Sequence, residues 1–219
     1  MKTVTTMAAL LLGATAVVAE VPVPQGCTPI VTIERNSCVA TTVFDCGDHF
    51  LDHGFVSGVL NDTHRFTKDW AFAGYALRNN LQTLEVLFDE GQSVTLPALV
   101  ENGSARTDRK AMVATGRIKD IEYRLQAEAT LGQDMVMLDG HAFRTGTLVR
   151  NFVPAKRSNN LVFEFDILVS EDLNLFIEGA YARQTQGSAP EKLAQDPVSL
   201  RFPGQPGFLA KQLEAGCNG

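Results

Sequence analysis

Residues 117–153 decide the fold, and they read RIKDIEYRLQAEATLGQDMVMLDGHAFRTGTLVRNFV. Apolar and polar side chains alternate through 117–129, as they do along a strand that buries one face. Asp139-Gly140 between two alternating segments is a strong hairpin signal, because a tight primed turn needs positive φ at both central residues. The stretch therefore predicts long antiparallel strands, and the alternation slips near Ile121 as it does at a β-bulge.

Further strands are expected on both sides of this hairpin. Gly, Asn, Asp and Pro residues divide the chain into segments of strand-like composition, from which we expect about nine strands. Outside 117–153 these segments are 38–44, 50–60, 65–77, 81–88, 110–115, 161–169, 173–177 and 198–202.

One short helix is predicted at 95–102, where Thr95 can cap the start and Asn102-Gly103 can form the end. Long alternating strands with short turns imply an antiparallel sheet, and a sheet this long must curl, close or be covered. We therefore predict a mainly β fold, with a single antiparallel curved sheet (half-barrel or barrel) and one or two short helices. A two-sheet sandwich is the alternative.

The N-terminal residues are typical of an export signal. Lys2 precedes an apolar run at 7–18 that is shorter than the roughly 20 residues of a membrane-spanning helix. Residues 1–19 are therefore predicted to be a signal peptide cleaved after Ala19. The remaining 20–219 are expected to form a single β-rich domain in the periplasm or outside the cell.

The charge pattern restricts the partners. The chain carries a formal net charge of −6, and its lysines and arginines are scattered rather than gathered into a stripe. Nucleic acid and anionic membrane surfaces are poor partners for such a protein. No apolar run after residue 19 is long enough to span a membrane, and no glycine-rich phosphate loop is present. We expect no cofactor and no transmembrane segment, and an apolar ligand or an envelope protein as partner.

The chain has four cysteines, which in an exported protein indicates two disulfides. If the strand between Cys38 and Cys46 is extended, these residues lie about 26 Å apart. A disulfide requires Cα atoms within about 7 Å. Two pairings remain open. One joins Cys27 to Cys38 and Cys46 to Cys217; the other joins Cys27 to Cys46 and Cys38 to Cys217, and would close a hairpin that turns near 36–37.

No catalytic or metal-binding motif is evident. His49 and His53 would lie about 13 Å apart on a strand, too far to share one metal ion. Ser57-Gly58 lacks the glycine that precedes a nucleophilic serine by two positions, because that residue is Phe55. The sequence therefore favours a protein that is not an enzyme and predicts no catalytic, metal or cofactor-binding residue.

Three aromatic residues, Phe66, Trp70 and Phe72, share the same strand parity within 65–77. Side chains of this kind most often fill the core of a protein. The alternative is that they line a ligand cavity.

Four segments, 38–46, 134–143, 173–179 and 202–208, resemble an uncharacterised group of exported proteobacterial proteins. The order of elements over about 100–200 also resembles the half-barrel fold of periplasmic lipoprotein carriers. That resemblance implies a curved antiparallel sheet that wraps short helices and holds acyl chains.

These observations together predict an exported, non-enzymatic binding protein that holds an apolar or amphipathic ligand in a curved β-sheet. Two alternatives remain. One is a partner-docking or inhibitor domain of the cell envelope, for which the turn-rich segment 203–208 would be the contact surface. The other is an enzyme whose site residues are scattered along the chain.

Overall fold

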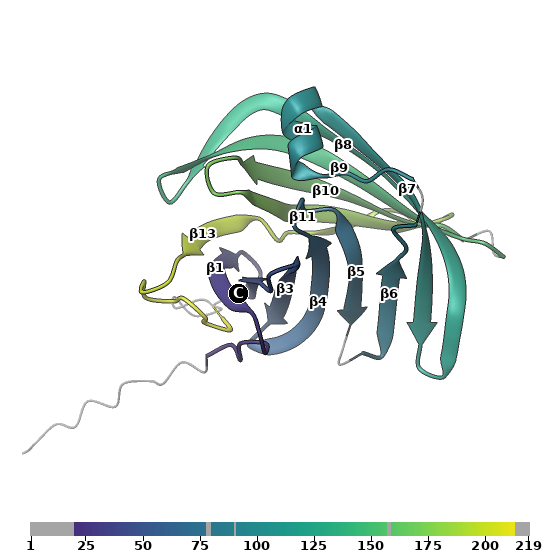
Figure 1. The fold of residues 1–219 in the computed structure, drawn as a ribbon, viewed down its shortest axis with the longest axis horizontal. Coiled ribbons are helices and arrows are strands. Elements are labelled where there is room, and N and C mark those ends of the chain that lie inside the picture. The colour runs from purple at the N-terminus through teal and green to yellow at the C-terminus, as the bar shows by residue number, and fades with distance from the viewer. Residues whose placement is uncertain (1–19, 78–79, 90, 157–158, 213–219) are drawn as a thin grey trace, which may run out of the picture.

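The structure, a computed structural model, describes residues 20–77, 80–89, 91–156 and 159–212. The predicted signal peptide and Cys217 lie outside the described residues. The described chain forms one curved antiparallel sheet of thirteen strands with one short helix, so the predicted half-barrel is confirmed (Figure 1).

The strands follow one another across the sheet in chain order from β1 to β12, and β13 pairs with the free edge of β1. In Figure 1 the strands of the first half of the chain cross those of the second half steeply, so that the sheet encloses its concave face. The strands are β1 Thr28–Arg35, β2 Val39–Asp45, β3 His49–Val56, β4 Val59–Thr67, β5 Phe72–Leu77, β6 Gln82–Val86, β7 Ser104–Thr115, β8 Ile118–Leu138, β9 His141–Pro154, β10 Leu161–Ser170, β11 Leu175–Thr185, β12 Glu191–Leu193 and β13 Pro197–Arg201.

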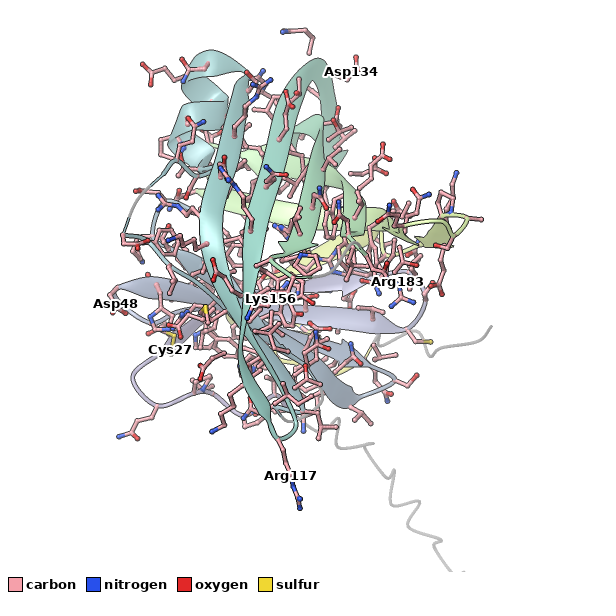
Figure 2. All side chains as sticks on the ribbon, turned by 90° about the vertical axis from the view of Figure 1, so that its right-hand side faces the viewer. Cys27, Asp48, Arg117, Asp134, Lys156 and Arg183 are labelled. Carbon is pink, nitrogen blue, oxygen red and sulfur yellow. A yellow bond between two sulfur atoms is a disulfide. The ribbon has the colours of Figure 1, made fainter. Side chains whose placement is uncertain are left out.

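The predicted central hairpin is confirmed as β8 and β9. Asp139 and Gly140 have φ of 46° and 82°, the values that a two-residue primed turn needs. The register of β7 against β8 shifts next to Val113, the partner of Ile121, where the slip in alternation predicted a bulge. β8 is one continuous strand that runs from the turn at Arg117 past Asp134 (Figure 2).

Two expected segments are divided by a turn, which raises the number of strands. The segment 50–60, in which the sequence shows interruptions at Gly54 and Gly58, is divided at Gly58, and the expected strand at 65–77 is broken at Trp70, which corrects that prediction. Ser57 and Gly58, with φ of 48° and 78°, form the turn between β3 and β4. Trp70 has φ of 63° in the turn between β4 and β5, and its amide donates to the Thr67 carbonyl. Trp70 therefore does not share a strand with Phe72. Its aromatic side chain is typical of strands, which conceals the turn in the sequence.

The predicted helix is confirmed as α1, Leu96–Asn102. The Thr95 side chain accepts a hydrogen bond from the Ala98 amide, and Gly103 ends the helix with φ of 72°. The helix packs on β7 and β8 with Leu96 and Leu99 buried. Within the described part of the chain, no helix is long and apolar enough to cross a membrane.

Apolar side chains fill one end of the half-barrel. Trp70 is 2% exposed, stacks on Phe50 at 4.5 Å between ring centroids, and donates from its indole nitrogen to the Asn174 carbonyl. Leu99 and Phe143 are fully buried in the same cluster. This end of the concave face is therefore a packed core.

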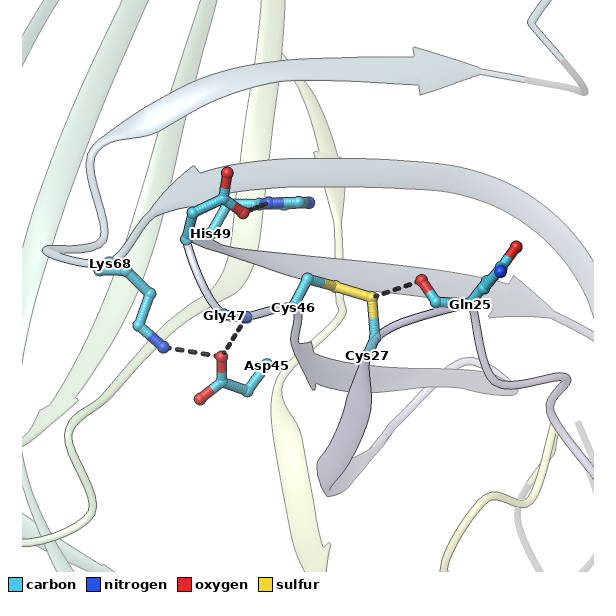
Figure 3. Close-up of polar contacts among 8 residues, drawn as sticks. Gln25, Cys27, Asp45, Cys46, Gly47, His49 and Lys68 are labelled. Atoms are coloured by element: carbon cyan, nitrogen blue, oxygen red, sulfur yellow. Dashed lines mark hydrogen bonds and ion pairs between the residues drawn. A yellow bond between two sulfur atoms is a disulfide. The ribbon is translucent and has the colours of Figure 1, made fainter.

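A disulfide joins Cys27 to Cys46, with the Cα atoms 4.0 Å apart (Figure 3). This bond confirms one half of the second predicted pairing. The predicted hairpin turn is also present, because Ser37 and Cys38 have φ of 59° and 58° between β1 and β2. The proposed partner of Cys38, Cys217, lies outside the described residues.

The chain also connects the two edges of the sheet. After β12 it passes through Gln195 and Asp196 and enters β13 beside β1. Arg35, the last residue of β1, donates to the carbonyls of Gln195 and Glu178 at 2.9 and 2.6 Å. The Asn36 amide donates to the Asp196 carbonyl. These contacts bring Arg35 against β11 at the inner face of the half-barrel.

Candidate functional site

The concave face holds a cavity of about 700 Å³. Its walls come from β1 to β6 on one side and from β9 to β12 on the other. Arg183 lies at the rim, on the opposite side of the molecule from Cys27 (Figure 2). The exposed pair Arg183–Glu191, with a nitrogen–oxygen distance of 2.5 Å, marks this mouth.

Aromatic rings form much of the cavity wall. The ring of Phe152 meets those of Tyr75 and Phe163 edge-on, with centroids 6.4 and 5.9 Å apart. Such contacts between rings stabilise a rigid apolar surface. The aromatic side chains that line the cavity are Phe66, Phe72, Tyr75, Phe152, Phe163, Phe165 and Tyr181.

A buried ion pair lies below these rings. Arg150 on β9 binds Glu178 on β11 with both terminal nitrogens, at 2.5 and 3.2 Å. The guanidinium carbon lies 4.1 Å from the ring centroid of Phe72 and 5.2 Å from that of Phe165. Burial alone would raise the pKa of Glu178, but the Arg150 charge and hydrogen bond outweigh it and lower that pKa. Both side chains are therefore charged and held in place.

Arg35 supplies a second buried cation. Its Nε donates to the Thr41 hydroxyl at 3.0 Å, and its Nη1 binds the two backbone carbonyls that connect it to the sheet edge. Among the described residues, no carboxylate lies within ion-pair distance of this guanidinium. Burial lowers the pKa of Arg35 from its usual value, and nearby carboxylates oppose that shift.

Asp52 faces the same space from β3. Its Oδ1 is buried and has no hydrogen-bond partner among the described residues. Burial is the main reason that the pKa of Asp52 rises to about 8, and the negative charges of Glu178 and Asp62 add to it against the effect of Arg35. A carboxyl group of this kind is mostly protonated at neutral pH. Perturbed groups in cavities are frequent at functional sites.

Asp62 and His64 reach the cavity from β4. Asp62 accepts a hydrogen bond from the Asn61 side chain at 2.7 Å. Its carboxylate lies over Gly54, where a Cβ would come within 2.3 Å of Asp62 Oδ1. His64 pairs across the sheet with Asp52 and contacts the aromatic wall. Gly54 therefore gives the Asp62 carboxylate the room it occupies beside Asp52.

The three aromatic residues singled out in the sequence contact one another but border different spaces: the Phe66 ring lies 5.5 Å from that of Trp70 and 5.9 Å from that of Phe72. Phe66 and Phe72 line the 700 Å³ cavity. Trp70 belongs to the packed end and borders, with Phe72, a separate space of about 10 Å³. The structure places His53 beside the Phe44 ring at 5.0 Å, and His49 Nδ1 lies 2.5 Å from a carboxylate oxygen of Asp48. No three His, Cys, Asp or Glu side chains of the described chain are grouped to hold a metal ion.

Sequence reasoning missed the charged residues of the cavity floor, Arg35, Arg150 and Glu178. The alternation of apolar and polar side chains along the strands contains a signal that could have identified these three residues. Each occupies a position that points inward, where the pattern of its strand calls for an apolar side chain. Arg150, for example, lies between the inward-facing Leu148 and Phe152. An inward-facing charge must be paired or functional, because an isolated buried charge is costly.

No protein-family model, curated protein sequence or solved structure matches this chain.

Proposed function

We propose that the protein binds an amphipathic small molecule, whose apolar part contacts the aromatic wall and whose polar end contacts the charged floor. The 700 Å³ cavity carries this proposal, because it combines a wall of aromatic rings with a floor of charged groups fixed by ion pairs and hydrogen bonds. Ligand sites in proteins span about 300–1,000 Å³.

The charged groups of the floor, to which Asp52 also belongs, favour an amphipathic ligand over a purely apolar one. A ligand made only of hydrocarbon would cover the Asp52 carboxyl group without giving its buried Oδ1 a hydrogen-bond partner. Unpaired buried polar groups cost about 1–3 kcal/mol each. A polar end that reaches Asp52 removes this cost. An acyl chain, as in the lipoprotein carriers that the strand order resembles, would suit the wall and would need a polar headgroup to suit the floor.

We also propose that binding takes place outside the cytoplasm. The predicted signal peptide and the Cys27–Cys46 disulfide support this location, since disulfides persist in oxidising compartments. The ligand would enter at the rim beside Arg183, where the cavity meets solvent.

Titration with the neutral fluorescent probe N-phenyl-1-naphthylamine tests the binding function. Leu161→Trp places a larger side chain in the cavity wall, and Glu164→Trp places the same one on an exposed position of the same strand. We expect the first variant to weaken probe binding about tenfold and the second to leave it unchanged. Equal probe affinity in both variants, or no probe binding by the wild type, would contradict the proposal.

Asp52 favours a second candidate function, that of a proton-transfer enzyme. A carboxyl group with a pKa of about 8 in a cavity is suited to general acid–base catalysis near neutral pH. Mass spectrometry of bound molecules after incubation separates the two functions. A molecule changed by the wild type and recovered intact from Asp52→Asn would establish turnover, whereas intact recovery from both proteins favours binding.

A further inference from the structure

The charges that line the cavity do not cancel. Three arginines, Arg35, Arg150 and Arg183, face the carboxylates of Asp52, Asp62, Glu178 and Glu191. Two ion pairs, Arg150–Glu178 and Arg183–Glu191, neutralise four of these seven groups. Arg35 is then left against Asp52 and Asp62, so the floor has one negative charge in excess whenever both aspartates are ionised.

The arginines at the floor have few free N–H groups with which to bind an anion. Arg150 uses both terminal nitrogens on Glu178, and its Nε is buried. Arg35 uses Nε and Nη1 on Thr41 and on backbone carbonyls. Binding of a carboxylate or phosphate by arginine is usually bidentate, with two parallel N–H groups. Neither guanidinium presents such a pair to the cavity.

The aspartates, by contrast, have acceptor atoms without donors. Asp52 Oδ1 is buried and has no partner in the part of the chain that the structure describes, and Asp62 accepts through Oδ2 from Asn61. Gly54 keeps Asp62 Oδ1 close to the β3 backbone beside Asp52. Two carboxyl groups on neighbouring strands thus line one cavity, and each has an oxygen without a hydrogen-bond donor among the described residues.

The ring faces above this space also suit a positive charge. Arg150 already occupies the faces of Phe72 and Phe165. Tyr75, Phe163 and Tyr181 line the cavity without a cation over them among the described residues. Aromatic faces attract ammonium groups, most strongly where water is excluded.

From this geometry we propose that the polar end of the ligand is an organic ammonium group that pairs with Asp52 and Asp62 at the cavity floor. The inference rests on the proposed function of binding an amphipathic molecule and names the chemical class of its headgroup. The apolar part of such a cation would lie against Phe152 and Phe163.

Binding of a cation would be coupled to proton release. The groups that face Asp52 are Arg35 on β1, Asp62 and His64 on β4, Arg150 on β9 and Glu178 on β11. With its pKa raised to about 8, Asp52 holds a proton in the empty cavity at neutral pH. An ammonium group favours the ionised form, so its affinity rises with pH up to about 8, by as much as about tenfold per unit.

Three matched probes test the headgroup: 4-phenylbutylammonium, 4-phenylbutan-1-ol and 4-phenylbutyrate. They share one tail and differ in charge. Isothermal titration calorimetry between pH 6 and 8.5, in two buffers of different ionisation enthalpy, measures affinity and proton release. At pH 7 we expect the ammonium to bind about tenfold more tightly than the alcohol, the butyrate to bind most weakly, and the ammonium to release about one proton.

Asp52→Asn is the test variant, because it keeps the shape of the side chain and removes the charge. It should abolish both the preference for the ammonium and the proton release, so that the ammonium and the alcohol bind this variant with similar affinity. Asp48→Asn is the matched control, since that carboxylate is 89% exposed and lies outside the cavity, and it should change nothing.

The outcomes separate this inference from the function on which it rests. If the alcohol or the naphthylamine probe binds and the ammonium binds no more tightly than the alcohol, the headgroup inference is overturned and the binding function stands. Tightest binding of the butyrate would also overturn it, in favour of Arg35 as an anion receptor. If the naphthylamine probe and all three phenylbutyl probes fail to bind, both proposals fail.

Discussion

Replacing Arg150 by Met should destabilise the protein strongly. Arg150 and Glu178 are 6% and 10% exposed and bind each other with two hydrogen bonds. Removing the cation leaves a buried carboxylate without a partner, which costs about 3–5 kcal/mol. The whole free energy of unfolding of a domain is about 5–15 kcal/mol, so the melting temperature should fall by roughly 6–20 °C.

Urea unfolding of four variants measures this cost. Arg106→Met is the matched control: Arg106 also forms a cross-strand ion pair, with Glu128 at 3.0 Å, but both side chains are more than half exposed. Its loss should cost less than about 1 kcal/mol. The double variant Arg150→Met/Glu178→Leu has neither charge, so it should regain most of the stability that Arg150→Met loses. Glu178→Leu alone leaves Arg150 unpaired and should be destabilising. If Arg150→Met costs no more than Arg106→Met, the reasoning about the floor is refuted.

Three further predictions concern the same fold. The pKa of Asp52 is raised to about 8, so the folded protein holds a proton that the unfolded chain releases above about pH 4. The free energy of unfolding should therefore fall as the pH rises towards 8. Urea titrations of Asp52→Asn should show a slope that is smaller by up to about 1.4 kcal/mol per pH unit. Replacing Cys27 and Cys46 together by Ala opens a loop of 19 residues and should lower the free energy of unfolding by about 3 kcal/mol, which an unchanged urea midpoint would contradict. Gly54→Ala should displace the Asp62 carboxylate, weakening 4-phenylbutylammonium severalfold while the melting temperature stays nearly constant; full affinity in this variant would show that the position of Asp62 does not matter.

Local signals in the sequence predicted the β-rich fold class, the central hairpin and the short helix. Asp139-Gly140 locates the central hairpin because few residues other than Gly, Asn and Asp tolerate positive φ, and Thr95 with Gly103 bounds the helix for the same kind of local reason. The turn around Trp70 escaped notice because no glycine or proline marks it. Its backbone is held by hydrogen bonds between Thr67 and Ala71.

The candidate site could not be predicted because its parts are far apart in the chain. Arg35, Asp52, Arg150 and Glu178 come from four strands, and only the curvature of the whole sheet brings them together. Alternation gives the same inward pattern at the packed end and at the open end of the half-barrel. The end that is filled depends on tertiary packing, chiefly of Trp70 and α1. This packing cannot be predicted from the local pattern of apolar and polar residues.

The pairing of β1 with β13 has a consequence for how the protein matures. The first strand finds its outer neighbour among the last residues of the described chain, with Thr32 opposite Arg201. During synthesis, the hydrogen-bonding edge of β1 therefore has no native partner until Pro197–Arg201 has emerged. Such long-range pairing slows folding, and an open strand edge promotes aggregation. The nascent chain should depend on a holding factor until its C-terminal strand arrives, and truncations before Pro197 should aggregate rather than yield a smaller folded protein.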